Sequence, residues 1–141
     1  MSNLNELLQL EAITQAKYDQ QQQSFRRIQS EENRLRAELR KHDEMLLRSN
    51  STDVRIGEMR AIGADVIWQG WVGRSKTELN LKLAQVLAIK EQQLQQVRQA
   101  FGKLQVVQQL ITETNDDQRK KKGQSRLELA MDTALHRVKS D

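Results

Sequence analysis

Few side chains in this 141-residue chain are of the types that perform catalysis or hold metal ions. There are two histidines, His42 and His136, and no cysteine, so neither a thiolate metal site nor a disulfide can form. No glycine-rich loop follows a strand-like run, so no phosphate-binding cradle is indicated. The carboxylates alternate with Lys and Arg, which is typical of a solvated helix face. We therefore expect no enzyme activity, no cofactor and no metal site.

The densest cluster of charge is the basic run Arg119–Lys122, which closely follows Asp116 and Asp117. Runs of this kind bind nucleic-acid phosphates or an acidic protein surface. Here no aromatic residue stands beside the run to stack on bases, and no basic region leads into a zipper. The simpler interpretation is a solvated helical turn balanced by the two aspartates, so nucleic acid is not the partner we expect.

Trp68 and Trp71 stand three residues apart and share one face if their segment is helical. They could close the turn end of a hairpin as an apolar plug. They could also anchor a partner, since Trp is enriched in the hot spots of protein interfaces. The plug is the favoured interpretation, and the two roles are compatible on different faces of the helix.

Heptad spacing of apolar residues predicts two long helices, because residues three and four apart fall on one stripe. The first helix covers about residues 4–49 and begins with a broad apolar face: Leu4, Leu7, Leu8, Leu10, Ile13 and Ala16. Its pattern then narrows to a seam: Tyr18, Phe25, Ile28, Glu32, Leu35, Leu39, His42 and Leu46. The second helix covers about residues 65–138 and has a similar seam: Leu83, Leu87, Lys90, Leu94, Val97, Phe101, Leu104, Gln108 and Ile111.

Residues 49–53 form the clearest break between the helices, because they cluster turn-forming and capping types. Within a glycine-rich connection of about residues 50–64, we expect a short helix near 53–61 and a bend near Gly63. Two seams of similar length joined by a turn predict an all-α fold, a long antiparallel two-helix coiled-coil hairpin in one domain over residues 1–141. A monomer is expected, because the break lets the seams meet within one chain. A homodimeric coiled coil is the alternative.

The C-terminal part of the second helix differs from its centre. Residues 112–126 contain no apolar side chain, and a last amphipathic piece follows in another register, with Leu127, Met131, Ala134 and Val138. We expect this C-terminal helix to protrude beyond the first helix. No intrachain helix is left to cover its apolar stripe, and an uncovered stripe is either frayed or docked on a partner.

The expected compartment is the cytoplasm. No apolar run approaches the roughly 20 residues that span a bilayer, and the N-terminus lacks the basic start and apolar core of a signal peptide. Any peripheral attachment at the inner membrane would then be made through partners. The net charge of +4 permits acidic partners without requiring them.

With these features the chain resembles the FliJ family of flagellar type III export stalk proteins, which are related to the YscO-type proteins of injectisomes. The resemblance covers most of the chain as a pattern of two antiparallel helices with an unequal C-terminal one. It is strongest at Trp68 and Trp71, near the start of the second helix, and at the stretch 126–134, Arg-Leu-Glu-Leu-Ala-Met-Asp-Thr-Ala.

This resemblance implies a non-enzymatic role as the central stalk of the export ATPase ring, with contacts to the export gate and to export chaperones. It implies that both termini reach into the ring, with partner-binding residues Leu4, Leu7, Leu8, Leu127, Met131 and Val138. Trp68 and Trp71 would then face the gate or the chaperones. The alternatives are a small nucleic-acid-associated coiled coil that uses the run at 119–122, and a homodimeric scaffold.

Overall fold

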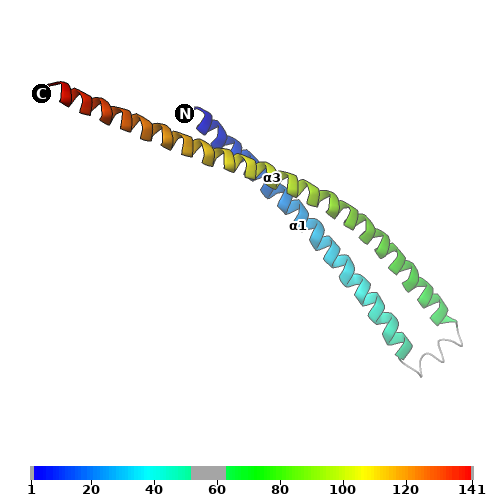
Figure 1. Cartoon of the computed structure of the whole chain (residues 1–141). Coiled ribbons are helices and arrows are strands. Elements are labelled where there is room, and N and C mark those ends of the chain that lie inside the picture. Colours follow the sequence, from blue (N-terminus) through cyan, green and yellow to red (C-terminus); the bar gives the residue numbers. More distant parts are fainter. Residues whose placement is uncertain (1, 52–62, 141) are drawn as a thin grey trace. The chain divides into compact units, whose positions relative to one another are not determined.

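The fold is all-helical in the part of the chain that the computed structural model describes, residues 2–51 and 63–140. Helix α1 covers Ser2–Ser51 and helix α3 covers Ala64–Ser140, and the two pack against each other as a helical hairpin (Figure 1). The predicted fold class is confirmed. The predicted ranges were about 4–49 and 65–138, and the short helix predicted near 53–61 lies outside the described residues.

Gly63 sets the start of α3. Its backbone has a φ of +73°, in the left-handed region that L side chains rarely adopt, and its carbonyl accepts a bond from the Ile67 amide at 3.3 Å. The bend expected near Gly63 is therefore present, and glycine is required there by the backbone conformation. No proline interrupts the 77 residues of α3 that follow.

Contacts between residues group the chain into two compact units, which are described separately. The central unit, Gln20–Val97, joins the second part of α1 to the first part of α3. Its core is a cluster of Leu35, Leu79 and Val86, against which Ile28, Leu39 and Leu83 pack. Within this unit the helices run side by side in opposite directions (Figure 1).

Polar contacts between described residues join the two helices of the central unit. Glu32 accepts a bond from Lys90 at 2.7 Å, and Asp43 accepts one from Lys76 at 2.7 Å. Ser75 Oγ lies 2.9 Å from Nε2 of the His42 ring. Residues later in α1 thus meet residues earlier in α3, which is the order that an antiparallel pair requires.

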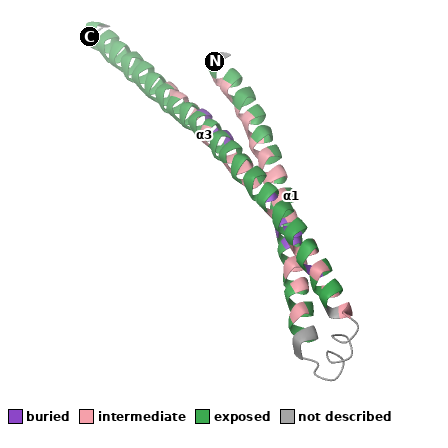
Figure 2. Ribbon diagram, turned by 90° about the vertical axis from the view of Figure 1, so that its right-hand side faces the viewer, coloured by how far each residue is buried: buried purple, intermediate pink, exposed green. Residues whose placement is uncertain are grey.

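The terminal unit combines Met1–Asp19 with Arg98–Asp141. The buried side chains of α3 in this unit are Ala100, Leu104 and Val107, and the rings of Tyr18 and Phe101 lie 5.4 Å apart at their centroids. Beyond Gln118 no described residue of α3 is even half-buried, and Figure 2 colours this last part of the helix as exposed. The protruding C-terminal helix is therefore present.

The predicted seam of α1 is confirmed, because all eight of its residues from Tyr18 to Leu46 are buried or half-buried. The broad apolar face predicted at the start of α1 is only partly buried. Leu4 and Leu7 are half-buried, whereas Leu8, Leu10 and Ile13 are exposed. The heptad line of α1 passes through Leu4 and Leu7, and its neighbours on either side stay in solvent.

One column of the predicted α3 seam was wrong. Leu83, Lys90, Val97, Leu104 and Ile111 are buried or half-buried as expected, and so is Leu94 of the other column, but Leu87, Phe101 and Gln108 are exposed. The buried residues are their predecessors Val86, Ala100 and Val107. A heptad seam alternates steps of three and four residues. From Leu83, the buried line of α3 takes the step of three first, to Val86, and then the step of four, to Lys90.

Candidate partner-binding surfaces

The hairpin end of the central unit has an exposed aromatic surface. Trp68 is half-buried, whereas Trp71 is 54% exposed and stacks on the His42 ring, with centroids 6.4 Å apart and ring planes 23° from parallel. Nδ1 of His42 lies 2.8 Å from the Glu38 carbonyl oxygen, so the imidazole is fixed and the indole of Trp71 rests on a rigid base. Trp71 thus presents a ring to solvent. The connection that the tryptophans were predicted to close lies outside the described residues, so the plug interpretation stays a prediction.

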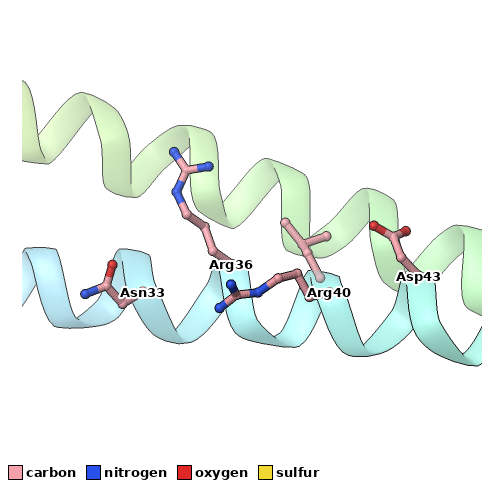
Figure 3. Close-up of a pocket in the computed structure, with 5 residues that line it drawn as sticks. Asn33, Arg36, Arg40 and Asp43 are labelled. Atoms are coloured by element: carbon pink, nitrogen blue, oxygen red, sulfur yellow. The ribbon is translucent and has the colours of Figure 1, made fainter.

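A groove of about 490 Å³ runs along α1 in the central unit. Asn33, Arg36, Arg40 and Asp43, which stand on α1 in Figure 3, line it together with Leu39. Two of its charged side chains already have partners, because Arg36 donates a hydrogen bond to Glu32 at 3.0 Å and Asp43 accepts one from Lys76. A groove lined from one helix and already neutralised within the hairpin offers few directed groups for a small ligand.

Glu32 is the one buried charged residue among the described residues, and it bonds to Arg36 of the groove. Lys90 donates to one of its oxygens and Arg36 to the other, and these two bonds hold the pKa of Glu32 below its usual 4.5. The carboxylate is therefore ionised and fully bonded. Arg34 is held in a similar way on the surface by Glu31 and Glu38, which raises the pKa of Arg34 and lowers that of Glu31.

At the N-terminal end of α1, two of the three predicted partner residues face α3. Leu4 and Leu7 lie on the seam, and Leu7 lines a groove of about 310 Å³ whose other lining residues are Asn3, Glu6, Leu10 and Thr114. Leu8 stands outside the seam and is exposed. Of the three predicted partner residues at this end, Leu8 is the exposed one, and Leu10 and Ile13 are exposed near it.

All side chains in the tail of α3, residues 119–139, are exposed. The predicted residues Leu127, Met131 and Val138 are exposed, and so are Leu129 and Leu135, which the sequence reasoning did not select. Leu135 extends the stripe by one position in the i, i+4 line from Met131, and that spacing could have identified it.

The sequence reasoning also missed an exposed apolar pair on α3 in the terminal unit. Val106 and Leu110 lie outside the buried seam, four residues apart, and both are exposed. They were overlooked because the wrong column of the seam placed the apolar face elsewhere on the helix.

Within the described ranges, no group of His, Asp and Glu side chains is arranged to hold a metal ion. None of the described helices is both long enough and apolar enough to cross a membrane. Comparison of the chain with models of protein families, with curated proteins and with solved structures finds no match.

Proposed function

We propose that this chain is a non-enzymatic component of a flagellar-type (type III) export apparatus, in which it acts as the central stalk of the export ATPase or as an escort of export chaperones. One observation carries the proposal. Helix α3 continues for residues 119–139 with every side chain exposed and with an uncovered apolar stripe, so one helix end is presented for binding. The resemblance of the sequence to FliJ-type proteins names the partner.

The central unit supports the proposal through its internal ties. Glu32, Asp43 and His42 each bond to α3, and the cluster around Leu35 packs between these bonds. Packing and directed bonds together fix one helix against the other, which a stalk that positions its ends requires. On the surface of the central unit, charged side chains such as Arg34 and Glu31 pair with each other.

The two ends of the hairpin would serve different partners. Leu8 and the stripe of Leu127, Met131 and Val138 supply apolar anchors for the ATPase ring. Trp71 supplies an aromatic anchor for the export gate or a chaperone, and Trp68, three residues before it in α3, is half-buried. The assignment of partners to ends rests on the resemblance to the family.

The test is a pull-down and a rate measurement with the cognate export ATPase. The wild-type chain should bind the ATPase and raise its rate, and the double variant L127S/M131S should weaken binding roughly tenfold or more, as expected for two interface anchors. Leu129→Ser is the control, because Leu129 is also an exposed leucine of the tail but stands off the stripe. The proposal fails if the wild-type chain neither binds nor stimulates the ATPase.

A homodimeric scaffold is the second candidate, since an uncovered apolar stripe can also pair with its own copy. Light scattering decides between the two. The hairpin packing of the central unit predicts a monomer mass, and a stable dimer would move the scaffold to first place.

A further inference from the structure

The tail of α3 contains the whole net charge of the protein. Residues 119–141 hold seven of the 23 Lys and Arg residues but only three of the 19 Asp and Glu residues, a net +4 that equals the charge of the entire chain. The remaining 118 residues are therefore neutral in sum. A segment with this excess attracts anionic surfaces, and all of its described side chains from residue 119 to residue 139 are exposed.

The apolar face of the tail is broader than a coiled-coil seam. At about 100° per residue, five apolar residues fall within about 80° of Leu127: Ala130, Met131, Ala134, Leu135 and Val138. The 58% exposure of Leu127 is matched by that of Leu135. Leu129, which is 72% exposed, lies about 160° from Leu127 and belongs to the opposite face.

One border of this apolar face is basic throughout. Arg119, Arg126 and Arg137 fall within about 20° of one another on the helix and adjoin the face, and Lys120 lies in line with it. The other border is mixed, with the acidic residues Glu128 and Asp132 beside Lys121 and Lys139. A helix that turned its apolar face and its arginine border to a surface would leave both acids in water.

These features favour a planar anionic partner over the alternatives. A single partner helix would bury a narrow stripe and leave much of this wide face uncovered. A second tail would carry the same net positive charge and would be repelled. A broad face with a basic border suits a planar layer of anionic headgroups over acyl chains.

The contact surface has a sharp upstream limit. Glu113 stands two heptads before Leu127 on the helix, and Asp117 stands two heptads before Met131. An anionic surface repels both carboxylates. The sign of the charge thus changes between Asp117 and Arg119. The surface that can lie on anionic lipid begins at the basic run.

We infer that residues 119–139 of α3 bind directly to anionic lipid surfaces as an interfacial amphipathic helix. Leu127, Met131, Leu135 and Val138 enter between the headgroups, and the arginine border and Lys120 bind lipid phosphates. Lipid binding requires no export ATPase. It uses the same apolar stripe that the proposed function gives to the ATPase ring, so one tail would bind either the ring or a membrane at a time.

The test is co-sedimentation of the full chain with vesicles of phosphatidylcholine alone, or of phosphatidylcholine with phosphatidylglycerol. The wild-type chain should bind only the vesicles with phosphatidylglycerol, and binding should fall with added salt. The variant R119Q/K120Q/R126Q/R137Q should bind at least about 100-fold more weakly, since each basic residue near an anionic surface contributes a severalfold gain. The control K17Q/R26Q/K41Q/K103Q removes four exposed charges elsewhere and should retain most of the binding.

A second pair of variants separates insertion of the apolar face from simple charge attraction. Leu127→Ser and Leu135→Ser should each weaken binding roughly tenfold, because each removes a side chain that leaves water on binding. Leu129→Ser should bind as the wild type does. Equal effects of L127S and L129S would overturn the inference, as would equal binding to both kinds of vesicle. Absence of vesicle binding at low salt also overturns it, and binding of duplex DNA by the same sample would then assign the basic run to nucleic acid.

Discussion

Two regions of helix α3 show that the availability of a partner helix, rather than hydrophobicity alone, decides what becomes buried. Between Trp68 and Val97 the seam includes a charged residue, Lys90, which is half-buried. Its ammonium group donates a hydrogen bond of 2.7 Å to Glu32 of α1. In the tail, Leu127 and Met131 are more apolar than Lys90 and remain exposed. The charged position is covered because α1 lies opposite it, and the apolar ones have no helix to cover them.

Glu32 and Lys90 determine how the two helices pair, whereas the apolar residues of the tail are available to bind another surface. A charged residue in a seam adds little stability, but it penalises every register in which its partner is absent. Glu32 and Lys90 therefore select the pairing of α1 with the first part of α3. The tail has no such pair and can accept any surface that covers its apolar face.

The largest expected contrast between the two regions is in amide hydrogen exchange. Amides of residues 119–139 open locally with little cost, whereas those around Leu79 and Val86 exchange only when the packed hairpin opens. We expect the amides of the seam to exchange at least about 100-fold more slowly. Equal protection in both regions, measured by mass spectrometry, would mean that the tail is covered in solution.

Truncation of the core should come next in size. Leu35 is 1% exposed at the centre of the cluster, so Leu35→Ala should lower the free energy of unfolding by about 2–5 kcal/mol. Leu81→Ala removes the same atoms from an exposed position on α3 and should cost less than about 0.5 kcal/mol. Urea denaturation followed by circular dichroism measures both, and similar losses would contradict the assigned seam.

Gln93 is a polar residue of the seam that, unlike Lys90, has a side-chain atom without a bonding partner among the described residues. The side-chain oxygen Oε1 of Gln93 is buried without a hydrogen-bond donor among the described residues. Gln93→Leu should raise the free energy of unfolding by about 1–2 kcal/mol, because it removes an unsatisfied polar group and adds apolar contact. Gln96→Leu, on the exposed surface, should change it little. Destabilisation by Q93L would show that the amide is bonded in solution.

The smallest effect concerns pH. Because Lys90 and Arg36 hold the pKa of Glu32 below 4.5, the folded state binds this proton less readily than the unfolded chain does. The stabilisation is fully present above pH 4.5 and is lost as the pH falls through the lowered value. Between neutral pH and acid, the wild type should therefore lose more stability than Glu32→Gln. Parallel pH profiles of the two melting temperatures would indicate that the bonds to Glu32 do not persist in solution.

The sequence by itself determined the two helices and the seam of α1. These features depend on local signals, the heptad spacing and the glycine at 63. The predicted break at 49–53 begins too early, because α1 continues to Ser51, and the rest of the predicted break lies outside the described residues. The α1 seam was predictable because large apolar residues such as Phe25 and Leu35 occur on its line, with polar residues on both sides. The register change of the tail was visible for the same reason.

Only the tertiary structure decided which column of α3 is buried and which apolar residues are left over. Val86 and Leu87 are adjacent and both apolar, and hydrophobicity favoured Phe101 over Ala100, so spacing alone could not choose between steps of three and four. The choice rotates the helix by about 100° per residue, and only the position of α1 settles it. Once α1 is in place, Ala100 and Val107 turn inward, Lys90 meets Glu32, and the residues of the tail remain in solvent because α1 provides nothing opposite them.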